Sequence, residues 1–241
     1  MRSRHTVPSR RWPVASAVVA LVLVASLPGT AGATASTVLA DWEMNEPPGS
    51  TTMADAGPNQ LTGTVGASVS TGVVASGATG FDWSKVKPNQ PPANPGRLVQ
   101  VDSALLNPGT SDYAVVFRYR STFKFGNIVQ KGQAHVAGGY FKVEQPGGYL
   151  NCFFTGKGGK ASIKSTHQTN DGLWHVVRCE RTATGVTLTV DGVVVGQTVH
   201  ATGMISNTSP LTVGGKLNCD NITITCDYFA GDIDYLVVEK G

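Results

Sequence analysis

Long apolar runs, helical periodicity and internal repeats are missing from nearly all of this sequence. After the first 35 residues, no stretch approaches the ~20 consecutive apolar residues of a transmembrane helix, and no window keeps a helical period. No serine lies on a glycine-flanked nucleophile turn, and the glycines fall at predicted turns rather than in a phosphate-binding loop. These absences argue against a membrane-spanning chain, a repeat array, a serine hydrolase and a phosphate-binding domain.

Acidic residues are absent from the first 40 positions, because the first one is Asp41. That stretch instead carries four arginines, then an apolar run over residues 14–27 and a small-residue segment over 29–35. This order is typical of a secretory signal peptide, which we predict to span 1–35. The remaining residues, 36–241, suffice for one domain. We therefore expect a secreted protein that is extracellular or associated with the cell envelope.

Positive charge is also scarce once the leader is set aside. The whole chain has a formal net charge of +3, but four of its 19 basic residues lie in the leader, which leaves 15 against 16 acidic residues, or about −1. Nucleic acids and anionic membrane surfaces require a basic footprint, so neither is an expected partner. Within the leader, Arg10 and Arg11 could direct twin-arginine export. The residues that follow them fit the general secretory route better.

Only four cysteines are present, and an even number in an exported chain favours disulfides. Three pairings are open. Cys219 and Cys226 lie within one short polar segment and would close a small loop, and Cys152 and Cys179 would then join two strands. A zinc site is disfavoured, because the cysteines do not form two close pairs and have no histidine at ligand spacing.

β-Strand patterns become regular after the proline-rich segment 85–96, which we predict to be a surface loop. The clearest hairpin joins 174–182 to 186–191, with Asp-Gly turns at 171–172 and 191–192. Further short strands are predicted at 97–101, 113–120, 127–131, 140–144, 149–155, 160–165, 211–214 and 232–239. This spacing predicts an all-β fold, an antiparallel two-sheet sandwich or jelly roll.

A series of short motifs runs through the chain in a set order. They are Trp42-Glu43-Met44-Asn45-Glu46, the turn 55–59, Leu105-Leu106-Asn107-Pro108-Gly109, Lys131-Gly132, Asp171-Gly172-Leu173-Trp174-His175, Val190-Asp191-Gly192 and Gly231-Asp232-Ile233-Asp234. Together they resemble the laminin G-like members of the concanavalin A-like jelly-roll superfamily. The resemblance implies two stacked antiparallel sheets. Most members of this superfamily bind glycans or proteins, and some cleave glycans; the proline-rich insertion departs from a minimal domain of this kind.

The resemblance also implies a structural calcium site. It would join Asp55 and Asn59, at a carbonyl-rich turn, to Asp232 or Asp234 on the last strand. Carboxylate and carbonyl oxygens are the ligands that calcium prefers. The alternative left open is that Asp55 caps its own turn and that Asp232 is simply solvated.

If Cys152 and Cys179 pair, both point into the sandwich, and strand alternation fixes the direction of their neighbours. Leu150, Phe154 and Val177 then lie inside. The predicted outward, ligand-binding face carries seven polar or aromatic side chains: Arg118, Arg120, Tyr140, Lys142, Asn151, Arg178 and Glu180. Such a face suits a sugar, because planar polar groups satisfy hydroxyls and a tyrosine ring supports a pyranose. The alternative is a solvated sheet crossed by ion pairs such as Lys142 with Glu180.

These patterns favour a secreted, non-catalytic module that binds an extracellular or cell-wall polysaccharide. A protein-binding or surface-structural role on the same fold stays open. Catalysis is less favoured, because retaining glycosidases need two carboxylates about 5 Å apart and the sequence lacks the expected Glu-x-Asp-x-x-Glu run. A polysaccharide lyase is the stronger catalytic alternative, with Tyr140 moving protons beside basic groups, although the Gln-Ile-His run of alginate lyases is missing.

Overall fold

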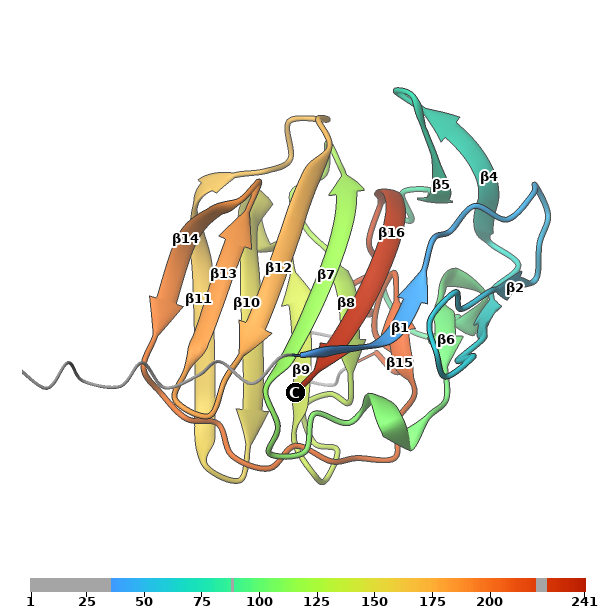
Figure 1. Cartoon of the computed structure of the whole chain (residues 1–241). Helices are drawn as coiled ribbons and strands as arrows, with labels where there is room; N and C mark the ends of the chain where they lie inside the picture. The colour runs from blue at the N-terminus through green and yellow to red at the C-terminus, as the bar shows by residue number, and fades with distance from the viewer. Residues whose placement is uncertain (1–35, 88, 220–224) are drawn as a thin grey trace, which may run out of the picture. The chain divides into compact units, whose positions relative to one another are not determined.

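Two antiparallel β-sheets lie face to face in the described chain (Figure 1). The computed structural model describes residues 36–87, 89–219 and 225–241, so the predicted signal peptide lies outside the described residues. The domain that follows it belongs to one compact unit. All pairings between the named strands are antiparallel, which confirms the predicted all-β, two-sheet jelly-roll class.

Sheet A contains the clearest predicted hairpin and both ends of the described chain. Its strand order is β14 (Val193–Thr198), β13 (Val186–Val190), β12 (His175–Arg181), β7 (Tyr113–Arg120), β16 (Gly231–Lys240), β5 (Ala78–Trp83) and β4 (Val69–Ala75). The first strand, β1 (Thr37–Trp42), also pairs with β16, and its Thr37 lies opposite Lys240. The first and last strands of the domain are therefore neighbours in the same sheet.

Sheet B holds the central part of the chain. Its order is β11 (Gly159–Gln168), β10 (Tyr149–Gly156), β9 (Tyr140–Glu144), β8 (Asn127–Lys131), β15 (Leu211–Val213), β6 (Val99–Val101), β3 (Gly63–Val65) and β2 (Thr52–Met53). Three short 3-10 helices lie in the connections: η1 (Pro95–Arg97) between β5 and β6, η2 (Ala104–Leu106) between β6 and β7, and η3 (Pro146–Gly148) between β9 and β10. The first of them ends the proline-rich segment, which is a loop as predicted.

The core lies between the sheets and follows from strand alternation. On β7, Val115, Phe117 and Tyr119 are buried, whereas Arg118 and Arg120 between and after them are partly exposed. Because successive side chains of a strand point to opposite faces, each strand gives one row to the core and one row to the outside. The outward rows therefore hold the side chains that can meet a ligand.

A disulfide between Cys152 and Cys179 joins the two sheets through the core. Cys152 belongs to β10 of sheet B, Cys179 belongs to β12 of sheet A, and their Cα atoms lie 5.5 Å apart. Both residues are fully buried, as are Leu150 and Val177. The predicted pairing and its inward direction are confirmed.

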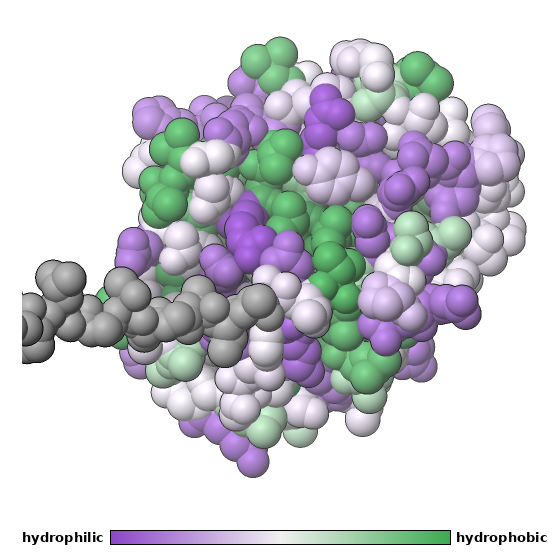
Figure 2. All heavy atoms as spheres, in the orientation of Figure 1, coloured by the Kyte–Doolittle hydropathy of each residue, from purple (hydrophilic) through white to green (hydrophobic). Residues whose placement is uncertain are grey.

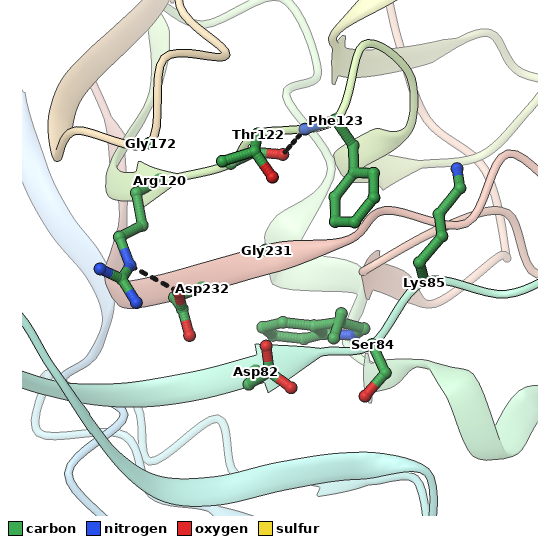
Figure 3. Close-up of a pocket in the computed structure, with 11 residues that line it drawn as sticks. Asp82, Ser84, Lys85, Arg120, Thr122, Phe123, Gly172, Gly231 and Asp232 are labelled. Carbon is green, nitrogen blue, oxygen red and sulfur yellow. Dashed lines mark hydrogen bonds and ion pairs between the residues drawn. The ribbon is translucent and has the colours of Figure 1, made fainter.

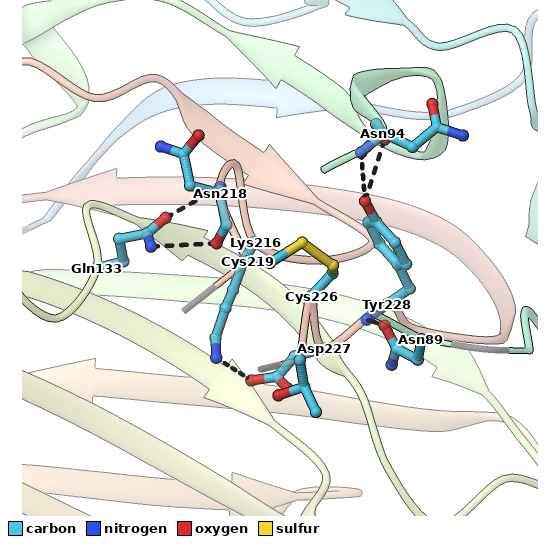
Figure 4. Close-up of a disulfide and its surroundings, with 10 residues drawn as sticks. Asn89, Asn94, Gln133, Lys216, Asn218, Cys219, Cys226, Asp227 and Tyr228 are labelled. Carbon is cyan, nitrogen blue, oxygen red and sulfur yellow. Dashed lines mark hydrogen bonds and ion pairs between the residues drawn. A yellow bond between two sulfur atoms is a disulfide. The ribbon is translucent and has the colours of Figure 1, made fainter. Parts of the chain in front are cut away.

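The second disulfide, between Cys219 and Cys226, closes a strap that we define by residues 216–219 and 225–228 (Figure 4). Cys226 packs with Leu98 and Tyr228 in a small second core. Leu98 precedes Val99, which lies in the main core, so strand alternation turns Leu98 to the outside of sheet B. The predicted pairing is confirmed, and the strap lies on the outward side of sheet B.

Polar contacts fasten the strap to β8 and to the loop that follows it. The backbone N–H of Asn127 donates to the carbonyl of Asp227 at 2.8 Å. The amide of Gln133 exchanges two hydrogen bonds with the backbone of Asn218, at 3.1 and 3.2 Å (Figure 4). Nζ of Lys216 lies 2.5 Å from the Asp227 carboxylate. The strap is therefore held in place on β8 and on the loop after it.

In the three described ranges, the structure contains no helix with the length and apolar character needed to cross a bilayer.

Removal of the inter-sheet disulfide should lower stability more than removal of the strap disulfide. A bridge between residues 27 apart lowers the entropy of the unfolded chain and so stabilises the fold by about 3 kcal/mol. The strap disulfide closes a shorter loop and stabilises the fold less. We expect the variant Cys152→Ala with Cys179→Ala to lose about 3 kcal/mol of unfolding free energy in urea titrations. A loss no greater than that of Cys219→Ala with Cys226→Ala would contradict this prediction.

Candidate functional site

The seven predicted ligand-binding residues lie on two opposite outward faces, so the single predicted face is wrong. Sheet A carries Arg118, Arg120, Arg178 and Glu180, and sheet B carries Tyr140, Lys142 and Asn151. The division arises because β7 pairs with β12 and β16, whereas β9 pairs with β8 and β10. The predicted inward and outward directions along each strand are confirmed, but the sequence does not say to which sheet a strand belongs.

On sheet A, the predicted arginines are held in ion pairs. Arg118 lies 2.8 Å from Asp234, and Arg120 lies 2.6 Å from Asp232. The guanidinium groups of both arginines also lie over the ring of Trp174, at 4.9 and 5.3 Å. Figure 2 shows the hydrophilic side chains of this face beside a hydrophobic strip.

Arg178 completes the ion pairs of sheet A. It lies 2.8 Å from Glu180 and 2.9 Å from Glu239, and the hydrogen bond that it donates to Glu180 raises the pKa of Arg178 despite partial burial. The suggested pair of Lys142 with Glu180 does not form, because each residue has a partner in its own sheet. This face matches the alternative of a sheet crossed by ion pairs.

The predicted calcium ligands lie in two separate places. Asp55 accepts hydrogen bonds from the backbone N–H groups of Asp41, Gly57 and Leu61, at 2.7 to 2.8 Å. Asp41 lies opposite Val237, five residues along β16 from Asp232, which corresponds to roughly 16 Å. Asp55 therefore locks its own turn, far along the sheet from the last-strand aspartates.

The other three predicted ligands also have protein partners. Nδ2 of Asn59 donates to the Leu39 carbonyl at 2.8 Å, and Asp232 and Asp234 form the arginine pairs described above. Within the part of the chain that the structure describes, no group of three or more His, Cys, Asp or Glu side chains is placed to hold a metal. Calcium binding stays a prediction.

The remaining three predicted residues belong to a regular grid on sheet B, which we call the β9–β11 face. Nine outward side chains form three rows that cross β9, β10 and β11 by direct strand register. The rows are Tyr140, Thr155 and Lys160; Lys142, Phe153 and Ser162; and Glu144, Asn151 and Lys164. The grid extends about 13 Å along the strands.

Aromatic rings and lysines share the first two rows of the β9–β11 face. The rings of Tyr140 and Phe153 stack with centroids 5.1 Å apart and an interplanar angle of 24°. Nζ of Lys142 and Nζ of Lys160 each lie 5.7 Å from the centroid of Phe153. At the edge of the grid, Lys164 lies 4.4 Å from the ring of Tyr149. The face thus combines an apolar platform with three ammonium groups.

A chain of hydrogen bonds fixes the polar side chains of the same face. Glu144 accepts from Nζ of Lys142 at 2.6 Å and from Nδ2 of Asn151 at 2.9 Å. The hydroxyl of Ser162 donates to Oδ1 of Asn151 at 2.8 Å. The direction of the Asn151 amide is therefore set by its neighbours, so a ligand meets groups that are already oriented.

The strap borders this face and creates a small hollow beside Tyr140. The hollow has a volume of about 50 Å³ and is lined by Gln130, Gln133, Ala134, Tyr140, Lys142 and Lys216. Burial and the charge of Glu144 raise the pKa of Tyr140, so its hydroxyl stays protonated at neutral pH. The face is open toward β11 and closed by the strap beside β9.

Several members of the grid were not predicted from the sequence. Lys160, Ser162 and Lys164 alternate along β11, a polar period of two that marks one face of a strand. This alternation can be read from the sequence. The strand register that places these side chains beside Phe153 cannot be read from it.

With the site in place, comparison with known proteins identifies the family. The model of the laminin G domain family matches residues 120–240, half of the chain. The chain belongs to the laminin G domain family. No curated protein matches the sequence. The matched range of this laminin G domain includes both disulfides and the whole β9–β11 face.

Solved structures share the fold of this laminin G domain at low sequence identity. Domain 4 of an extracellular arabinanase from Geobacillus stearothermophilus, in complex with arabinotriose, has a TM-score of 0.61 and 11% identity, covering 86% of this chain and 93% of that domain. The binding domain of botulinum neurotoxin DC, in complex with SialylT, has a TM-score of 0.55 and 12% identity, covering 84% and 46%.

A mouse laminin fragment gives a partial match. Domains LG4-5 of the laminin alpha1 chain have a TM-score of 0.45 and 19% identity, covering 54% of this chain and 36% of the fragment. This laminin G domain thus spans less than half the length of the laminin fragment and the toxin binding domain. The likenesses show the fold alone.

His175 of the laminin G domain bridges two turns. Its Nδ1 lies 2.7 Å from the Asp191 carboxylate and its Nε2 lies 3.1 Å from the Asp171 carboxylate. Burial alone would lower the pKa of His175, but the hydrogen bonds to Asp191 and Asp171 outweigh it, so the pKa lies above the ordinary value of 6.5. When it is protonated, the imidazolium therefore joins the turn before β12 to the turn after β13, at the open end of the central hairpin.

This contact predicts a defined pH dependence of stability. Because the folded-state pKa is raised, the contribution of His175 is complete below about pH 6.5 and is lost as the pH rises through the folded-state pKa. We expect the difference in unfolding free energy between the wild type and His175→Gln to shrink between about pH 6 and pH 9. Urea titrations across that range measure it, and a constant difference would contradict the prediction.

Calcium binding by the laminin G domain is tested by its melting temperature. If calcium binds at the last-strand aspartates, added calcium raises the melting temperature and excess chelator lowers it. The variant Asp232→Asn should then abolish the calcium response. An unchanged melting temperature in excess chelator would contradict the prediction.

Proposed function

We propose that this laminin G domain is a secreted, non-catalytic module that binds an extracellular or cell-wall polysaccharide through the β9–β11 face. The observation that carries the proposal is that stacked rings, three ammonium groups and a fixed chain of hydrogen bonds share one outward surface. Ligand sites combine apolar surface with a few precisely placed polar groups, as this face does.

Each part of the face has a counterpart in a sugar. The apolar side of a sugar ring packs on Tyr140, whose own ring stacks against Phe153. Sugar hydroxyls exchange hydrogen bonds with Asn151 and Ser162, which can both donate and accept. Because the face is open toward β11, a chain of several sugars can extend along it.

Charge favours an acidic polysaccharide. The nine-residue grid holds three lysines, Lys142, Lys160 and Lys164, and only one acid, Glu144. Carboxylate, sulfate or phosphate groups on the chain would approach the three ammonium groups at the surface, where salt screens the attraction. We therefore infer a preference for acidic over neutral chains that weakens as ionic strength rises.

Further features support export and glycan recognition. The leader at 1–35 has the order of a signal peptide, and two disulfides are typical of proteins outside the cytosol. Among the structural neighbours, the arabinanase domain was solved with arabinotriose.

Affinity electrophoresis with a panel of acidic and neutral polysaccharides tests the proposal. We expect retardation by an acidic polysaccharide, less retardation at high salt, and affinities about tenfold weaker for Tyr140→Ala and for Lys142→Ala. Lys124→Ala removes the same charge from an exposed loop outside the grid and should bind as the wild type does. Wild-type retardation of the double variant Tyr140→Ala with Lys142→Ala would contradict the proposal.

The same experiment separates the alternatives. Retardation by no polysaccharide, together with capture of a cell-envelope protein, would favour the protein-binding or surface-structural role. Release of an unsaturated, ultraviolet-absorbing product from a uronate polysaccharide would show lyase activity and contradict the non-catalytic part of the proposal.

A further inference from the structure

A larger cleft lies on the outward side of sheet A, where β5 and β7 end and β16 begins (Figure 3). Its volume is about 420 Å³, within the range of small-ligand sites. Its lining includes the side chains of Asp82, Ser84, Lys85, Arg120, Phe123 and Asp232. The cleft shares no residue with the β9–β11 face, which belongs to sheet B.

Two carboxylates form the polar floor of the cleft. Asp232 lies directly opposite Asp82 on β5 and Arg120 on β7, so the three side chains form one cross-strand row. Nε of Arg120 donates to Asp232 at 2.6 Å. Burial, and then the neighbouring charge of Asp232, raise the pKa of Asp82, while a hydrogen bond from Ser84 opposes this shift. Additional hydrogen-bond donors would therefore stabilise the ionised form of Asp82.

Three contacts hold the arginine of this row in place. Besides Asp232, Arg120 donates from Nη1 to the hydroxyl of Ser76 at 2.7 Å, and its guanidinium lies 5.3 Å from the ring of Trp174. Asp232 itself is only 9% exposed. The floor is thus preorganised, and a ligand that binds there does not have to order it.

An aromatic side chain forms the other part of the cleft. Phe123 is 36% exposed although it is large and apolar, and Nζ of Lys85 lies 5.3 Å from its ring centroid. Its backbone N–H donates to the hydroxyl of Ser121 at 3.0 Å, and that hydroxyl donates to the Ala230 carbonyl at 2.7 Å. Figure 3 shows Phe123 and Lys85 at one end of the cleft and Arg120 with Asp232 at the other.

Charge and size identify the class of ligand. The two carboxylates are balanced by Arg120 and Lys85, so the cleft does not favour an ion of either sign. Carboxylates accept hydrogen bonds from hydroxyl groups, and an exposed ring packs against an apolar ring face. A neutral, polyhydroxylated ring meets all three conditions.

We propose that this cleft is a second carbohydrate site, which binds a neutral sugar at a chain end or a side branch. Its volume holds about one or two sugar rings, so it cannot follow a long chain as the open β9–β11 face can. Asp82 and Asp232 accept hydrogen bonds from adjacent hydroxyls, and Phe123 packs on the ring. The proposal does not depend on the β9–β11 face, because the two sites lie on different sheets.

Amide chemical-shift titrations of the full domain with small neutral sugars test the proposal. The probes are glucose, galactose, mannose, xylose, arabinose and cellobiose, each up to about 50 mM, since a site of this size binds single rings near the millimolar range. We expect at least one of them to shift the amides of Gly172 and Gly231, which line the cleft. Phe123→Ala and Asp82→Ala should each weaken that sugar about tenfold.

Matched controls make the outcome decisive. Phe125→Ala removes an aromatic ring of similar exposure from the same loop but outside the cleft, and should bind the sugar as the wild type does. Absence of shifts with all six sugars, or unchanged affinity in both cleft variants, would overturn the proposal. Polysaccharide binding by the β9–β11 face is measured separately, with the Tyr140 and Lys142 variants. A negative result at one site therefore does not contradict the proposal for the other.

Discussion

The alternation of side chains between two sheets, fixed by the Cys152–Cys179 bridge, is the constraint on which the rest of the structure depends. The bridge requires both cysteines to point inward, and their strand neighbours Asn151 and Arg178 must then point outward. On β10 and β12, the direction of every outward side chain follows from this one covalent contact and the period of two. The chemistry of both surfaces is thus set by the packing of the interior.

The charged side chains of the two outward surfaces have different kinds of partner. On sheet A, arginines and carboxylates neutralise each other across β7, β12 and β16, and Trp174 fills the space over two guanidinium groups. On sheet B, lysines lie over aromatic rings and only Glu144 balances them. On sheet A the charged groups neutralise one another, whereas on sheet B the lysines outnumber the acid and can interact with a ligand.

Sequence reasoning reached the fold class, both disulfides and the direction of most strand side chains. These depend on local patterns, namely the period of two and the small spacing of Cys219 and Cys226. The strand β14 was not predicted, because Val193, Val194 and Val195 form a continuous apolar run that does not alternate. The proline-rich loop was predicted correctly, since proline excludes strand and helix interiors irrespective of context.

The site was predicted only in part, for a physical reason. Tyr140, Lys142 and Asn151 do share a face, but Arg118 and Arg178 lie on the other sheet because strand order depends on long-range pairing. The cleft at Asp82 was missed for the same reason: β5, β7 and β16 are distant in sequence and adjacent in the sheet. A period of two gives the face of a side chain, and only the pairing gives its neighbours.

The antiparallel pairing of β1 with β16 also determines how such a domain can be attached to other chains. Thr37 and Lys240 are cross-strand partners, so the entry and the exit of the polypeptide lie next to each other on sheet A. A linker fused before Thr37 or after Lys240 would therefore begin at the same end of sheet A, the sheet opposite the one that carries the β9–β11 face.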